Sequence, residues 1–346
     1  MVRVTILASG SRGNCTVVAT SKTRVMLDVG LSCREIVKRM RFAAEDPEKL
    51  DAILITHEHQ DHIQGLSVMA RKWNLPVFAT EATHAAWKRW MSPRRTMSFA
   101  AWLEMRRRQQ STAVPQSGPE SENELLHGDP PANDLTEAGL ELANLTAECE
   151  GSQIEASPAV DEAANSDAEL FTPASEDPAY LPVVEYFRAG IAFEIGDVRV
   201  TPFTIPHDAA DPVGFVLEAE GMRIAIATDL GYVPPNVRMH LLGADLLMIE
   251  SNHDVEMLRD GPYPWAVKQR VLSRVGHLSN DAVGEYLAKD YDGCARFVVL
   301  AHISESNNLP ELARISAERA LSGKMGLLAN KVLLASQTTP LESIYL

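Results

Sequence analysis

Short runs of apolar residues, bounded by polar or glycine-containing turns, alternate with helical patterns over most of the chain. Such short runs are typical of buried strands, whereas a spacing of three to four residues indicates an amphipathic helix. Strands are predicted at 3–8, 15–20, 24–28, 52–56, 76–80, 191–195, 198–205, 213–218, 222–228, 245–250 and 296–301. Helices are predicted at 64–74, 280–291 and 309–321, with Asn280 and Asn308 as candidate caps. This alternation predicts an α/β fold.

One long segment interrupts the pattern. Residues 109–178 are rich in Ser, Pro, Ala, Glu and Asp and nearly free of aromatic side chains. Such a composition cannot bury enough apolar surface to offset the chain entropy lost on folding. We therefore expect a long, acidic, disordered insertion, 109–178, within a single domain that spans 1–346. A regulatory or partner-binding role for the insertion is the alternative.

The net negative charge of the whole chain comes from this segment and the few residues after it. The net charge is −15, but residues 109–187 carry 17 Asp and Glu and no Lys or Arg, which leaves +2 for the rest. The body of the protein is therefore close to neutral. The overall charge does not exclude a nucleic-acid substrate.

Several classes of protein are excluded or disfavoured by composition. No apolar stretch of about 18 residues occurs, so a membrane-spanning helix is not expected. The N-terminal residues run directly into a predicted strand and lack the apolar core of a signal peptide. Four scattered cysteines are too few for a disulfide framework. We expect a cytoplasmic protein, and its oligomeric state stays open.

The strongest chemical signal directly follows the predicted strand 52–56. His57, His59, Asp61 and His62 lie within six residues. A turn there lets the four side chains converge at one edge of a sheet, with His57 and His59 toward one cation and the other two toward a second. Imidazole and carboxylate ligands together suit Zn²⁺, and also Mn²⁺ or Fe²⁺. The sequence therefore predicts two divalent metal ions, with zinc as the first candidate.

The motif His-x-His-x-Asp-His after a strand resembles the signature of the metallo-β-lactamase family. The resemblance implies a four-layer αββα sandwich and three further ligands, each at a strand end. The chain offers His207, Asp229 and His302 in that order. By this resemblance His207 completes the first metal site, Asp229 bridges both ions and His302 completes the second. Asp28, at the end of another predicted strand, would orient a ligating histidine or cap a turn.

Several local phrases are similar to one branch of this family, the WalJ (YycJ-like) bacterial exonucleases. These phrases are Ala8–Asn14, His207–Gly214, Glu250–Asp254, Gly276–Asn280 and His302–Asn308. An aspartate at position 229 argues against the β-lactamases that use a cysteine ligand there. The long acidic insertion is where the chain departs from the branch.

The resemblance implies a metal-dependent hydrolase of phosphodiester bonds, expected to be a DNA exonuclease with a hydroxide between the two ions as nucleophile. Asp61 would hold this hydroxide and accept its proton, and His277 would bind phosphate or protonate the leaving oxygen. Glu250 would hold His277 in one tautomer. The substrate phosphates are expected to contact Ser11, Arg12, Asn14, Ser304 and Asn307.

Two alternatives remain open at this point. A small-molecule hydrolase of cyclic phosphates or thioesters is favoured by the lack of an obvious nucleic-acid-binding arm. A non-catalytic metal-binding sensor is disfavoured by the complete set of ligands, because an inactive descendant would lose ligands freely.

Overall fold

The computed structural model describes residues 1–92, 177–322, 324 and 331–346, all of which fall in one compact unit. The predicted acidic insertion, 109–178, lies outside the described residues except for its last two. Its disorder and its place within a single domain therefore stay predictions. Within the described part, no helix is long and apolar enough to cross a membrane.

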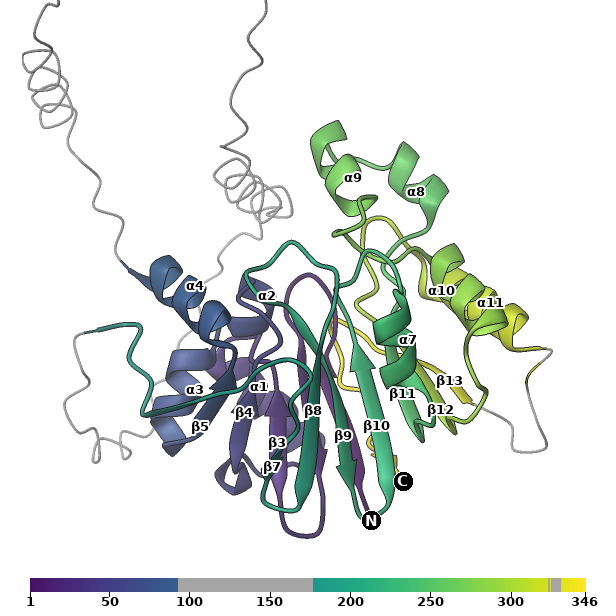
Figure 1. The fold of residues 1–346 in the computed structure, drawn as a ribbon. Helices are drawn as coiled ribbons and strands as arrows, with labels where there is room; N and C mark the ends of the chain where they lie inside the picture. Colours follow the sequence, from purple (N-terminus) through teal and green to yellow (C-terminus); the bar gives the residue numbers. More distant parts are fainter. Residues whose placement is uncertain (93–176, 323, 325–330) are drawn as a thin grey trace, which may run out of the picture. The chain divides into compact units, whose positions relative to one another are not determined.

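Two seven-stranded sheets form the centre of the fold (Figure 1). The first has the order β14-β1-β2-β3-β4-β5-β6, with bounds Ile344–Tyr345, Arg3–Ala8, Cys15–Ala19, Arg24–Leu27, Ala52–Leu54, Pro76–Ala79 and Val183–Tyr186. The second has the order β13-β12-β11-β10-β9-β8-β7, with bounds Lys331–Leu334, Phe297–Ala301, Leu246–Glu250, Met222–Ala227, Val213–Ala219, Val198–Thr204 and Phe193–Ile195. Both sheets are mixed, with β3 to β6 parallel and β10 to β13 parallel.

Helices cover the outer face of each sheet (Figure 1). Those that follow strands of the first sheet are α1 (Cys33–Phe42), the 3₁₀ turn η1 (Pro47–Lys49), α2 (Gln60–Ile63), α3 (Leu66–Trp73) and α4 (Glu81–Met91). Those that follow strands of the second are α7 (Pro235–Leu241), α10 (Asn280–Lys289) and α11 (Pro310–Leu321). The short helices α8 (Val255–Asp260) and α9 (Trp265–Val271) lie beyond the edge of the sheet (Figure 1).

The alternation of side chains along the central strands produces these layers. On β11, Leu246 and Met248 pack in the core between the two sheets, together with Val4 of β1. Leu247 and Ile249 point the other way, into the core beneath α10 and α11. Because successive residues of a strand face opposite sides, one buried strand contributes side chains to both cores. The predicted αββα sandwich is confirmed.

All eleven predicted strands are present, with ends that agree within two residues. The predicted helix 64–74 begins too early, because Gly65 lies against the chain at Val29 and Leu31. Its N–H donates to Val29 O at 2.8 Å, and an added Cβ would lie 2.3 Å from Leu31 O. The helical region therefore divides into α2 and α3, and α3 ends where Asn74 adopts a left-handed conformation, φ 49°.

Both predicted asparagine caps are wrong. Ser279, one residue earlier than Asn280, caps α10 by accepting a hydrogen bond from Ala282 N. At α11 the cap position is Leu309, without a side-chain hydrogen bond. The buried Asn308 amide instead donates to the carbonyl oxygens of Ser251 and Asn252, each at 3.0 Å. It ties the start of α11 to the loop after β11.

Candidate metal centre

The loops that follow the carboxyl ends of β4, β8, β10 and β12 bring all seven predicted metal ligands together. They form two groups, His57 with His59 and His207, and Asp61 with His62, Asp229 and His302. Within each group the potential ligand atoms all lie within 4.8 Å of one another. The groups are adjacent, since the ring centroids of His57 and His62 are 4.1 Å apart.

The first group consists of three imidazoles. His59 Nδ1 lies 3.1 Å from His57 Nε2 and 3.2 Å from His207 Nε2. Two nitrogens that bind one zinc at about 2.0–2.1 Å with tetrahedral angles stand roughly 3.3 Å apart. The spacing of these nitrogens therefore fits a single tetrahedral ion.

The second group mixes two imidazoles with two carboxylates. Asp61 Oδ2 lies 3.4 Å from His62 Nε2 and 3.3 Å from His302 Nε2, and His62 Nε2 lies 3.4 Å from Asp229 Oδ2. This oxygen of Asp229 is buried and has no hydrogen-bond donor among the described residues. A buried carboxylate oxygen without a donor is costly. A cation in this group would satisfy it, so these residues also fit a divalent metal ion.

Asp28 and Thr56 orient His62. Asp28 Oδ2 lies 2.8 Å from His62 Nδ1, which leaves Nε2 to face the second group. The Thr56 backbone N–H and hydroxyl both donate to the Asp28 carboxylate. The same hydroxyl lies 3.0 Å from His57 Nδ1. Asp28 thus holds a histidine in place, as a buried carboxylate behind a metal-binding imidazole commonly does.

The backbone and a glutamate fix three further imidazoles. His207 Nδ1 lies 3.1 Å from Val275 O, so its Nε2 faces the first group. Glu250 Oε1 lies 2.8 Å from His302 Nδ1 and 2.7 Å from His277 Nδ1. Val275 and Glu250 therefore select the tautomers that expose Nε2 of their histidines to the site.

Buried charges set the protonation of the centre. Burial lowers the pKa of His207 to about 4 and lowers that of His57 well below its usual value, with His62 adding to the effect. Both rings are therefore neutral at pH 7 and offer a lone pair. Burial alone would raise the pKa values of Asp61 and Asp229, but His62 and His302 outweigh it and lower both. Both carboxylates are therefore ionised at neutral pH.

The backbone at three site residues lies in the left-handed region. The φ angles are 57° for Asp28, 62° for Asp229 and 52° for His302. This conformation costs a non-glycine residue about 1–3 kcal/mol, and such residues often cluster at functional sites. It turns each side chain toward the centre immediately after its strand ends.

The predicted phosphate contacts lie in two loops near the centre. Ser11 and Arg12 are exposed, and the Arg12 guanidinium pairs with Glu305 at 2.9 Å. Asn14 is buried, with its amide nitrogen 3.2 Å from Asp61 Oδ2. Ser304 and Asn307 are also buried. Their contacts with a phosphate remain predictions.

Sequence reasoning missed three residues that support the ligands. These are Thr56, described above, and Ser9 and Asn252, which both fix the backbone of His302. Ser9 Oγ accepts from His302 N at 2.8 Å, and Asn252 Nδ2 donates to His302 O at 2.9 Å. Ser9 stands 293 positions from His302 along the chain, so local sequence gives no sign of this contact. The only available signal was that Ser9 lies in the segment Ala8–Asn14, which resembles the family.

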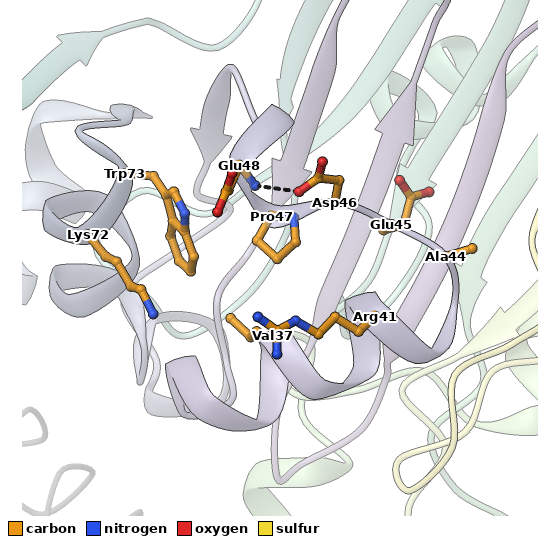
Figure 2. Close-up of a pocket in the computed structure, with 9 residues that line it drawn as sticks. All are labelled: Val37, Arg41, Ala44, Glu45, Asp46, Pro47, Glu48, Lys72 and Trp73. Carbon is orange, nitrogen blue, oxygen red and sulfur yellow. Dashed lines mark hydrogen bonds between the residues drawn. The ribbon is translucent and has the colours of Figure 1, made fainter. Parts of the chain in front are cut away.

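A surface cavity of about 330 Å³ lies away from this centre. Figure 2 shows it, lined by Val37, Arg41, Ala44, Glu45, Asp46, Pro47, Glu48, Lys72 and Trp73. No member of the two ligand groups lines it. The cavity lies beside η1, which precedes β4, whereas the ligands follow the carboxyl ends of β4, β8, β10 and β12. The chemistry of the two ligand groups therefore does not extend to this cavity.

Comparison with known proteins agrees with the fold and the centre. The family model of the metallo-beta-lactamase superfamily matches residues 8–263. The chain is 30% identical over 319 residues to exodeoxyribonuclease YycJ of Bacillus anthracis, covering 92% of this chain and 89% of that protein. It is 28% identical to exodeoxyribonuclease WalJ of Streptococcus pneumoniae strain D39, covering 92% and 88%.

Solved structures share the fold at low sequence identity. The metallo-beta-lactamase fold protein YhfI from Bacillus subtilis superposes with a TM-score of 0.54 at 13% identity, covering 98% of both chains. The predicted resemblance to the WalJ and YycJ exonucleases is confirmed, and family, relatives and ligand groups together identify a metal-dependent hydrolase. Because the family model spans most of its residues, the chain belongs to the metallo-β-lactamase superfamily.

Proposed function

We propose that the chain is a dinuclear metallohydrolase of phosphodiester bonds that acts on DNA as an exonuclease. The observation that carries the proposal is the pair of adjacent ligand groups. The ring centroids of His57, in the first group, and His62, in the second, are 4.1 Å apart. Neighbouring divalent ions are suited to in-line displacement at phosphorus. The names of the relatives, both exodeoxyribonucleases, favour DNA over other phosphodiesters.

The two groups would hold one ion each, with zinc the expected species and Mn²⁺ or Fe²⁺ the alternatives. When bound, the ions would lower the pKa of water and neutralise charge that develops on the phosphate. Asp229 Oδ2 lies 3.4 Å from His62 Nε2 in the second group, the ring of His62 adjoins that of His57 in the first group, and the family resemblance gives this carboxylate the bridging position. It is therefore the ligand that we assign to both ions.

Asp61 and His277 are the groups that we assign to proton transfer. The Asp61 side chain is 20% exposed, and its lowered pKa keeps it ionised, so it can accept a proton from the attacking water. The His277 side chain is 18% exposed. Because Glu250 engages its Nδ1, its Nε2 is left to donate a proton to the leaving oxygen.

The loop phosphate contacts complete the proposed site. Ser11 and Arg12 lie on an exposed loop after β1, where a guanidinium can bind phosphate through two hydrogen bonds. Ser304 and Asn307 follow β12, and Asn14 reaches Asp61. A cytoplasmic location, expected from the cysteine content, is part of the same proposal.

Metal content and a substrate panel test the function together. Mass spectrometry of the native protein should find two divalent ions per chain. The metal-loaded protein should hydrolyse bis-p-nitrophenyl phosphate and DNA, and it should leave a thioester intact. RNA and double-stranded DNA in the same panel define the range of substrates. Hydrolysis of the thioester alone would support the small-molecule alternative, and no hydrolysis with intact metal would support the sensor.

Ligand variants connect the metal to the activity. His59→Ala and Asp229→Ala should lose metal and turnover while circular dichroism shows an intact fold. His240→Ala, on α7 outside the centre, is the matched control and should keep both ions. Full activity of Asp229→Ala would contradict the proposed centre.

A further inference from the structure

A helical arm, residues 254–276, connects the loop after Glu250, the last residue of β11, to the loop that contains His277. The arm contains α8 and α9, which lie beyond the same edge of the sheets as α2, the helix with Asp61 and His62 (Figure 1). Both ends of the arm are therefore tied to residues of the candidate active site.

The last turn of the arm lies directly on the metal centre. Val275 O accepts a hydrogen bond from Asp208 N at 3.1 Å and lies 3.1 Å from His207 Nδ1. Gly231, in the loop after β10, touches the arm so closely that an added Cβ would lie 2.4 Å from the carbonyl of Arg274. The position of the arm is thus fixed relative to the ligands.

One face of α9 is exposed and partly aromatic. Trp265 is 65% exposed and Leu272 is 47% exposed, and Gln269 between them is also exposed. Their spacing places the three residues on one side of the helix, while Val267 on the other side is buried. An exposed indole offers a flat surface on which an unpaired base can stack.

The charges of the arm single out Arg274. The other cations have partners: Arg259 pairs with Asp260, Lys268 donates to the carbonyls of Arg259 and Gly261, and Arg270 pairs with Asp208. Among the residues that the structure describes, no carboxylate pairs with Arg274. Its guanidinium instead stacks on the ring of Tyr232 at 4.5 Å, and Tyr232 follows Asp229 by three residues. A positive charge next to the centre remains available to an anion.

We infer, on the basis of the proposed nuclease activity, that the arm binds the single-stranded part of the DNA substrate. Arg274 contacts a backbone phosphate beside the metal centre, and a base farther along the strand stacks on Trp265. Residues 265–271 are helical and the three that follow form a turn, so with a rise of about 1.5 Å per residue over this compact stretch the two lie roughly 13 Å apart along the arm. This corresponds to about four nucleotides at the roughly 3.4 Å rise of one strand.

Substrate length tests the inference. For the metal-loaded native protein, KM for single-stranded oligonucleotides should fall from the dinucleotide to about the pentanucleotide and then level off. In the double variant Trp265→Ala/Arg274→Ala, KM for an octanucleotide should rise about 10- to 100-fold, the scale of one stacked base with a phosphate contact. The matched control Arg41→Ala/Phe42→Ala, an exposed pair at the end of α1, should keep the native dependence on length.

Two results would overturn the inference in distinguishable ways. If the native protein cleaves oligonucleotides and the arm variant shows the same dependence of KM on length, the arm does not bind the substrate, although the nuclease function stands. If the native protein cleaves no oligonucleotide while it hydrolyses another substrate, the proposed nuclease function is wrong, and the inference about the arm is wrong with it. The dependence of KM on salt gives a separate readout, because the loss of Arg274 should reduce the slope of log KM against log salt concentration by about one.

Discussion

Glu250 Oε1 lies 2.8 Å from His302 Nδ1 and, at the same time, 2.7 Å from His277 Nδ1. The other carboxylate oxygen, Oε2, accepts from the backbone N–H groups of Leu230 and Leu278 at 2.9 and 3.1 Å. One buried side chain therefore connects a proposed ligand, a proposed acid and two loops. Burial would raise the pKa of Glu250, but His277 and His302 lower it to about 2, so it acts as an anion.

Glu250→Gln should weaken metal binding. The amide of glutamine must place its N–H₂ group either against the two backbone N–H donors or against the two imidazoles, which leaves buried donors without acceptors. Loss of a partner behind a ligating histidine typically reduces metal affinity about 10- to 100-fold. Competition with a chromophoric chelator measures the effect.

Glu285→Gln makes the same chemical change at an exposed pair on α10, where Glu285 contacts Lys289. It should leave metal affinity unchanged. Equal affinities in native protein, Glu250→Gln and Glu285→Gln would show that Glu250 does not support a ligand.

Thr56→Val tests a residue that sequence reasoning missed. The substitution keeps the shape of the side chain but removes the hydroxyl that contacts Asp28 and lies 3.0 Å from His57 Nδ1. We expect a loss of about 1–3 kcal/mol in the free energy of unfolding, measured by urea denaturation, together with weaker metal binding. Thr16→Val, at a buried position on β2, controls for the change of threonine to valine. A loss no larger than that of the control would contradict the role of Thr56.

Most strands and the cluster His57, His59, Asp61 and His62 were predictable because both depend on local sequence, whereas His207, Asp229 and His302 were predicted through the resemblance to the family. Apolar runs define buried strands, and His207, Asp229 and His302 each stand within a few residues of the end of such a run. The start of α3 was not predicted, because it is set by contact of Gly65 with a segment more than 30 positions earlier. Local propensity carries no information about such a contact.

The contacts that support the ligands also join residues that are far apart in the sequence. Ser9 and His302 meet only because β1 and β12 lie in sheets that pack face to face. The left-handed backbone at Asp28, Asp229 and His302 also has no usable sequence signal, since Asp and His adopt this conformation more often than most residues but do so at only a small fraction of their positions. The arm 254–276 was overlooked because α8 and α9, with six and seven residues, are too short to show a clear helical period.

His277→Ala should separate proton transfer from metal binding. If His277 donates a proton to the leaving oxygen, the variant keeps two ions per chain but loses about 10²- to 10⁴-fold in kcat. However, Asp229, Glu250, His277 and His302 also form a group that could hold a metal. Mass spectrometry on the variant distinguishes the two roles: loss of one ion would make His277 a ligand and would change the assignment of His302.

Stability at acidic pH should depend on His253, a buried residue whose ring nitrogens have no hydrogen-bond partner among the described residues. Burial lowers its pKa from 6.5 to about 4. Because the folded pKa is the lower one, the neutral ring stabilises the fold above about pH 6.5, and this contribution is lost as pH falls toward 4. At pH 5 the loss is about 2 kcal/mol. The His253→Phe variant cannot take up the proton. The difference in unfolding free energy between native protein and variant should therefore shift by this amount between pH 7.5 and pH 5. Urea denaturation with a chelator present measures this difference. A constant difference across this range would show that His253 is protonated equally in the folded and unfolded chains.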